Sequence, residues 1–152
     1  MPAYLKDLDL TKQLQTVCRF VIDDMVKRIQ GKVDINGNPV YPNAKSTIKK
    51  KGFDHRMVDS RNFIKHAFRF DAKKTVASIF INKAKHPNSK ASYWQIGAWN
   101  LKGHPSQAVE RASEWFGLNK SVEEKANKYL AKEIFNQIDK KLVYKEIINA
   151  VL

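Results

Sequence analysis

Residues 43–70 read NAKSTIKKKGFDHRMVDSRNFIKHAFRF, and this basic stretch decides how the chain is organised. Residues 44–51 are predicted to form a short amphipathic helix, and Gly52 can supply the left-handed residue that ends it. A second short helix is predicted to follow, capped by Asp59 or Ser60 and ending at about residue 68. The side chains that would form its buried face are Phe63, Ile64, Ala67 and Phe68.

Positive charge is concentrated in the middle third of the chain. The 152 residues have a formal net charge of +13, and residues 45–90 hold 13 Lys or Arg but only three Asp or Glu. Because a block of like charge repels itself, it must face water or an oppositely charged partner. Three interpretations stay open: a solvated face, contact with nucleic acid or a DNA-filled channel, and contact with an acidic protein.

Around the basic stretch, the pattern predicts one α+β domain over residues 1–152. Apolar residues recur at steps of three and four over residues 10–30, which predicts a long helix that Gly31 can cap. Asn36-Gly37 favours a two-residue turn in a short hairpin, with a flexible linker as the alternative.

A small antiparallel sheet is predicted within about residues 68–100. Residues 68–70 and 75–81 would pair across a turn at residues 71–74, and the second strand would be covered on both faces for part of its length. Residues 82–92 are polar and are predicted to form an exposed loop.

The last third of the chain is predicted to be helical, with C-terminal helices over about residues 121–152. Ser121 and Glu124 form a capping-box pattern at the start of a helix that runs to about residue 139. Apolar residues continue to the last position, and an apolar chain end is costly in water. We therefore expect this end to fold back on the core or to dock on a neighbour.

Patterns typical of catalysis or metal binding do not occur in the sequence. The single cysteine, Cys18, excludes an internal disulfide and a cysteine-based zinc site. The four histidines lack metal-ligand spacing, and there is neither a Gly-rich phosphate loop nor a G-x-S-x-G motif. We therefore expect no catalytic residue, no metal and no cofactor. A metal-dependent nuclease that uses Asp54, His55 and His104 is the remaining enzymatic alternative.

The sequence also bears on where the protein acts. No run approaches the roughly 18 apolar residues that a membrane-spanning helix needs, and the first residues lack the pattern of a signal peptide. We expect an intracellular address, or a particle assembled inside a cell, and no membrane partner.

Basic and aromatic residues interleave between residues 45 and 74, as in many nucleic-acid-binding surfaces. Two short helices could form a helix-turn-helix, but the link from Gly52 to Asp59 is longer than the turn of that motif. Non-specific phosphate contact fits better than recognition of base sequence. A small basic DNA-binding protein, of regulator or nucleoid type, is therefore the alternative function.

Four short segments occur in a fixed order, and their letters are STIKKKG at 46–52, MVDS at 57–60, YWQIG at 93–97 and WFGLN at 115–119. They resemble the S-T-I-x-x-K-G, L-x-D-T-G-x-L, Y-A-x-x-H-Q-x-G and P-F-L-G-L-S segments of the virion morphogenesis, or tail-completion, proteins of tailed phages. Order and rough spacing agree from about residue 10 to residue 139. Arg61 stands where that family usually has glycine.

The resemblance implies a non-enzymatic structural protein of the virion at the head–tail junction, assembled in the host cytoplasm. Such a protein completes or caps the tail as a ring, here a hexamer, around a DNA channel. The implied partners are further copies of the chain, other neck, connector or tail-tube proteins, and packaged DNA in non-specific contact. A closed ring needs heterologous interfaces, and a pore through which DNA slides needs contacts that ignore base sequence.

Two sets of candidate contact residues follow. For contact with DNA or a partner, the prediction names the basic residues Lys49, Lys50, Lys51, Arg56, Arg61, Lys73, Lys83 and Lys85. For contact between subunits, it names the large apolar residues Trp94, Trp99, Trp115, Ile148 and Leu152. The alternative for each tryptophan is packing in the core of its own chain.

Overall fold

The computed structural model is a mixed helical and sheet protein, which confirms the predicted α+β class. It describes residues 8–40, 42, 45–52, 61–102 and 115–151, and in the last helix it describes side chains as far as Lys140. In chain order the elements are α2 (Thr11–Gly31), α3 (Lys45–Lys51), α4 (Asn62–His66), β1 (Phe68–Lys73), β2 (Val76–Ile81), α5 (Tyr93–Lys102) and α6 (Lys120–Val151).

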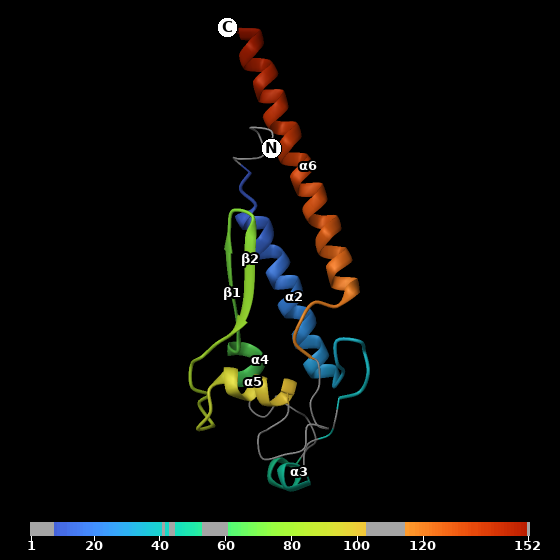
Figure 1. Cartoon of the computed structure of the whole chain (residues 1–152), viewed down its shortest axis with the longest axis vertical. Helices are drawn as coiled ribbons and strands as arrows, with labels where there is room; N and C mark the ends of the chain where they lie inside the picture. The colour runs from blue at the N-terminus through green and yellow to red at the C-terminus, as the bar shows by residue number, and fades with distance from the viewer. Residues whose placement is uncertain (1–7, 41, 43–44, 53–60, 103–114, 152) are drawn as a thin grey trace.

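Helix α2 is the central element of the fold. The β1–β2 hairpin lies along one side of it and the first half of α6 along the other, while α4 and α5 lie beyond the base of the hairpin (Figure 1). This position follows from the apolar stripe of α2, whose side chains are buried at Leu14, Cys18, Val21, Met25 and Ile29.

The end of α2 differs by one residue from the prediction. Lys32, with φ 56°, takes the left-handed conformation in place of Gly31. The N–H of Lys32 donates to the carbonyl of Ile29, and the N–H of Val33 donates to the carbonyl of Arg28. These two bonds form a Schellman motif, which satisfies the last carbonyls of the helix.

The hairpin predicted at Asn36-Gly37 forms, but with a different turn. Val33 and Pro39 make a single antiparallel bridge, and Gly37 alone has a positive φ of 83°. The Asp34 carboxylate accepts the N–H groups of Asn36 and Asn38, at 2.8 Å each. This Asx-type arrangement favours a three-residue loop with one left-handed glycine over the two-residue turn, which needs positive φ at both positions.

The two-stranded sheet is longer than predicted. Strands β1 and β2 pair in antiparallel register from Phe68↔Ile81 to Lys73↔Val76, and the turn consists of Lys74 and Thr75. The expected coverage of both faces of β2 is wrong for the described residues. Phe80 is 49% exposed because α2 covers only the opposite face of the sheet.

Backbone bonds hold the hairpin against the start of α2. The N–H of Leu10 donates to the carbonyl of Lys74, and the N–H of Lys74 donates to Oγ1 of Thr11, both at 2.9 Å. The turn end of the hairpin therefore lies at the N-terminal end of α2, and its open end lies beside the aromatic core.

The core between the base of the hairpin and α2 is aromatic. Trp115 is 1% exposed, and its ring lies 5.7 Å from that of Phe63 and 6.0 Å from that of Phe68, both edge to face. These geometries are the ones that aromatic quadrupoles favour. Tyr93 and Met25 close the same cluster.

Two short helices differ from the prediction. Helix α4 begins at Asn62 after Arg61, whose φ of 58° is left-handed, and the predicted caps Asp59 and Ser60 lie outside the described residues. Residues 93–102, expected within the sheet region, form α5. Its start is a capping box: Oγ of Ser92 accepts the N–H of Gln95, and Oε1 of Gln95 accepts the N–H of Ser92.

Helix α6 is one continuous element from Lys120 to Val151. It is capped by Asn119 in place of Ser121, since Oδ1 of Asn119 accepts the N–H of Val122 at 2.9 Å. Its first half packs on α2 through Ala126, which is buried, and through Tyr129, whose ring meets that of Phe20 edge to face. It then extends past α2 and the turn of the hairpin (Figure 1).

Candidate interaction surface

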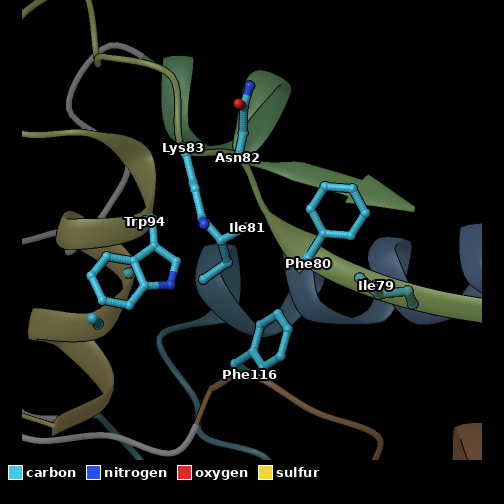
Figure 2. A pocket seen from close by; sticks show the side chains of 9 residues that line it. Ile79, Phe80, Ile81, Asn82, Lys83, Trp94 and Phe116 are labelled. Carbon is cyan, nitrogen blue, oxygen red and sulfur yellow. The ribbon is translucent and has the colours of Figure 1, made fainter. Parts of the chain in front are cut away.

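An open groove lies beside the end of β2. It has a volume of about 900 Å³ and is lined by Ile79, Phe80, Ile81, Asn82, Lys83, Trp94, Gly97, Ala98 and Phe116. Figure 2 shows Trp94, Phe116 and Phe80 around this space, with Lys83 extending toward it between Trp94 and Phe80. Apart from Asn82 and Lys83, the lining side chains are apolar or aromatic.

The two aromatic side chains at the rim of the groove are exposed to solvent. Trp94 is 52% exposed and Phe80 49% exposed. Single exposed apolar side chains are ordinary, but two large rings around one apolar groove make this groove a candidate contact surface.

Backbone bonds fix Trp94 beside the strand. The N–H of Trp94 donates to the carbonyl of Asn82, and the N–H of Tyr93 donates to the carbonyl of Ala84, both at 3.0 Å. Asn82 itself continues the hairpin, since its N–H donates to the carbonyl of Ala67. The start of α5 is therefore joined directly to the end of β2.

Gly97 allows α5 to approach the strand closely. A Cβ atom at this position would lie 2.7 Å from Cδ1 of Ile81 and 3.4 Å from Cζ2 of Trp115. Any side chain here would push α5 away from Ile81 and change the shape of the groove.

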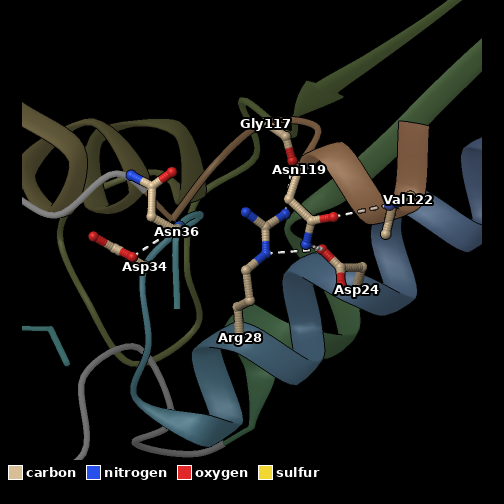
Figure 3. A network of polar contacts seen from close by, with 7 residues as sticks. All are labelled: Asp24, Arg28, Asp34, Asn36, Gly117, Asn119 and Val122. Atoms are coloured by element: carbon tan, nitrogen blue, oxygen red, sulfur yellow. Dashed lines mark hydrogen bonds and ion pairs between the residues drawn. The ribbon is translucent and has the colours of Figure 1, made fainter. Parts of the chain in front are cut away.

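A polar network holds the segment that contains Trp115 and Phe116 (Figure 3). Arg28, 5% exposed on α2, donates from Nη2 to the carbonyl of Gly117 at 2.6 Å, and its Nε lies 2.9 Å from Oδ2 of Asp24. That Nε contact is an ion pair whose N–H is not aligned for a hydrogen bond. Asp24 also accepts from Nδ2 of Asn119 at 3.0 Å.

The network couples three elements of the fold. Burial lowers the pKa of the Arg28 guanidinium, and the Asp24 carboxylate partly opposes this effect. Since Asn119 both caps α6 and donates to Asp24, one network fixes the start of α6 and the segment before it against α2. This role is structural, and it keeps Phe116 at the wall of the groove.

The predicted basic contact residues do not gather on one face. Lys49 and Lys50 are exposed on α3, at one end of the molecule, while Lys73 is exposed beside the turn of the hairpin, toward the other end (Figure 1). Lys83 and Lys85 are exposed near the groove. Arg61 is exposed before α4, the side chain of Lys51 is not described, and Arg56 lies outside the described residues.

The predicted subunit-contact residues differ in how far they are exposed. Trp115 is a core residue, so the prediction that it contacts another subunit is wrong for this structure. Trp94 is exposed and Trp99 is half-buried, so for both the prediction stays open. The Ile148 side chain and Leu152 lie outside what the structure describes.

Helix α6 offers a second exposed surface. Nε2 of Gln137 reaches the carbonyl of Asp9, just before α2 begins, at 3.4 Å. From there to Val151 the helix continues for about 20 Å at its usual rise per residue. Phe135, 67% exposed, lies on the same helix two residues before Gln137.

The groove could not be predicted from the sequence, although the sequence does carry a signal for one of its walls. The Ser92 to Gln95 spacing is a capping box that predicts α5. Phe80, Phe116 and Arg28 carried no local signal, because their roles depend on segments far apart in the chain.

Two other kinds of feature are absent from the part of the chain that the structure describes. No three His, Cys, Asp or Glu residues there lie close enough together to hold a metal ion. None of the described helices is long and apolar enough to cross a membrane.

Comparison with models of protein families, with curated proteins and with solved structures found no match to this chain.

Proposed function

We propose that this chain is a non-enzymatic structural protein of a tailed-phage virion, in which copies form a ring, a hexamer, at the head–tail junction. The observation that carries this proposal is the backbone at Arg61. Its φ of 58° is the left-handed conformation that favours glycine, and glycine is what the tail-completion proteins usually have at this position.

A second glycine position of the same motifs agrees with this argument. Gly52, at the end of α3, has φ 79°, and its N–H donates to the carbonyl of Ile48 at 2.8 Å. The S-T-I-x-x-K-G pattern places its glycine at this helix end. Two backbone positions thus have the geometry that a glycine in the family's motifs would serve, which supports the resemblance on physical grounds.

The shape of the molecule suits an assembly role. A ring of identical subunits needs two different surfaces that meet head to tail. The face of α6 around the exposed Phe135 is a candidate for one of these surfaces. Large apolar and aromatic side chains are the usual energetic centres of interfaces.

The spread of exposed cations fits a channel lining better than a reader of base sequence. Lys49 and Lys73 lie toward opposite ends of the molecule, so they cannot enter one groove of DNA side by side (Figure 1). Separate lysines can still contact phosphates as DNA passes, because that attraction does not depend on base sequence.

The test is electron microscopy of particles made by a phage that lacks this gene. DNA-filled heads beside detached or overlong tails are expected, and a wild-type copy of the gene should restore joined virions. A copy that ends at Lys140 keeps the contacts of α6 with α2 and is expected to fold but not to restore joining. Intact, infectious virions from the deletion strain would refute the proposal.

Duplex binding distinguishes the alternative of a dedicated DNA-binding protein. Such a protein holds duplex DNA at physiological salt and loses affinity steeply as salt rises. For a neck protein we expect weak binding by the single chain. Tight, salt-dependent binding by the monomer would favour the alternative.

A further inference from the structure

We propose that the outer edge of β2 and the groove beside it bind an extended acidic segment of a partner protein, which adds a third strand to the hairpin. The register of the hairpin, the walls of the groove and the charges around it support this inference independently of the virion role.

The register shows which backbone groups of β2 point outward. The two-residue turn is closed by the pair Lys73↔Val76, so Val76, Ser78 and Phe80 exchange hydrogen bonds with β1. The bond from the Asn82 N–H to the carbonyl of Ala67 continues this alternation. The N–H and C=O groups of Ala77, Ile79 and Ile81 therefore point to the other edge, where no described residue hydrogen-bonds to them.

The groove runs along this same edge. Phe80 points to one face of the sheet and Ile79 and Ile81 to the other, yet all three line the groove (Figure 2). Only a space that passes along the edge of the strand can be lined from both faces. An added strand placed there would bond to the outward backbone groups, and its alternate side chains would meet Phe80 on one face and Trp94 on the other.

The charges around the groove select the chemistry of the partner. Lys83 lines the groove, Lys85 follows it, and Arg69 is the cross-strand neighbour of Phe80; all three are exposed. No carboxylate is among the residues that line it. An acidic segment is attracted to this edge, whereas a second copy of the chain would bring the same cations and its own net charge of +13.

Hydrogen exchange of the free chain, read at single amides, is the first test. The amides of Ile79 and Ile81 should exchange faster than those of Ser78 and Phe80, which are bonded to β1. Equal protection of all four amides in dilute protein would mean that the edge is already occupied, by the chain itself or by a second copy, and would overturn the proposal.

Peptide binding is the second test, measured by fluorescence anisotropy of labelled synthetic peptides. The probe alternates Val and Thr and ends in two Glu, and the comparison peptide ends in two Lys. The acidic probe should bind more tightly, and it should slow exchange at Ile79 and Ile81 while leaving Ser78 and Phe80 unchanged. Failure of the acidic probe to bind, or equal binding of both peptides, would overturn the proposal.

Substitutions separate the contribution of the strand edge from that of charge. Ile79→Pro removes one outward N–H but no bond to β1, and should weaken binding of the acidic probe about tenfold, while Ile79→Ala keeps that N–H and should weaken it less. Lys83→Glu should weaken it about fivefold, and Lys128→Glu, on the exposed face of α6, should not. Far-UV circular dichroism verifies that each variant is folded. Undiminished binding by folded Ile79→Pro would contradict strand addition.

Discussion

Removal of the Asp24 carboxylate should destabilise the protein more than its partly exposed position suggests. In Asp24→Ala, the buried Arg28 guanidinium keeps its hydrogen bond to the carbonyl of Gly117 but loses its only described ion-pair partner, and Asn119 loses an acceptor. Breaking a buried pair from one side costs about 3–5 kcal/mol. Because solvent reaches part of Asp24, we expect the lower end, about 3 kcal/mol.

The partner substitution should cost less. Arg28→Met replaces the cation with an apolar chain of similar length, so no buried charge remains, and the main loss is the bond to Gly117, about 1–2 kcal/mol. The double variant Asp24→Ala, Arg28→Met should therefore be more stable than Asp24→Ala alone by about 1 kcal/mol or more.

Urea unfolding followed by far-UV circular dichroism measures these differences. Asp23→Ala is the matched control, since Asp23 is the exposed neighbour of Asp24 on α2, and it should stay within about 0.5 kcal/mol of the wild type. A cost under about 1 kcal/mol for Asp24→Ala, or a double variant that loses the sum of the two single losses, would refute this role of the buried pair.

Three further outcomes follow from the structure. Arg61→Gly should raise stability relative to Arg61→Ala by about 1 kcal/mol in urea unfolding, because only glycine takes a φ of 58° without strain; equal stabilities would contradict this reading of the backbone. Gly97→Ala should lower stability by roughly 1 kcal/mol, since the clash with Cδ1 of Ile81 exceeds the gain in helix propensity. Ile81→Val shortens the clashing side chain and should remove part of that loss in the double variant. If the losses of the two single variants simply add, the clash is not the cause. At Asp34, burial raises the pKa of the carboxyl, but hydrogen bonds from the backbone N–H groups of residues 36–38 lower it by more. The net shift of this pKa is therefore downward. The stability that Asp34 contributes is therefore present above about pH 4 and is lost as pH falls through its lowered pKa, so the gap to Asp34→Ala should shrink in acid unfolding curves; a constant gap would exclude this linkage.

The sequence by itself determined the elements whose signals are local. The three- and four-residue steps of α2 form one apolar face wherever that helix packs. Gly52 ends α3 as expected because a left-handed residue at a helix end depends only on its own backbone. The α+β class followed from such signals, and the exposure of Lys83 and Lys85 followed from the polarity of their loop.

Tertiary structure decided what depends on distant partners. A tryptophan in an apolar segment can face the core or another subunit, and Trp115 faces the core because Phe63 and Phe68, about 50 residues earlier in the chain, surround it. Asn119, and not Ser121, caps α6. Asn119 also donates to Asp24 on α2, so its position depends on a contact with a distant helix.

The groove is the clearest case of such dependence. Its walls come from β2, α5 and Phe116, and none of these segments indicates alone that the others lie beside it. Local patterns specify which face of an element is apolar. Only the packing of elements together decides how much of that face stays uncovered, because burial depends on which neighbours arrive from elsewhere in the chain.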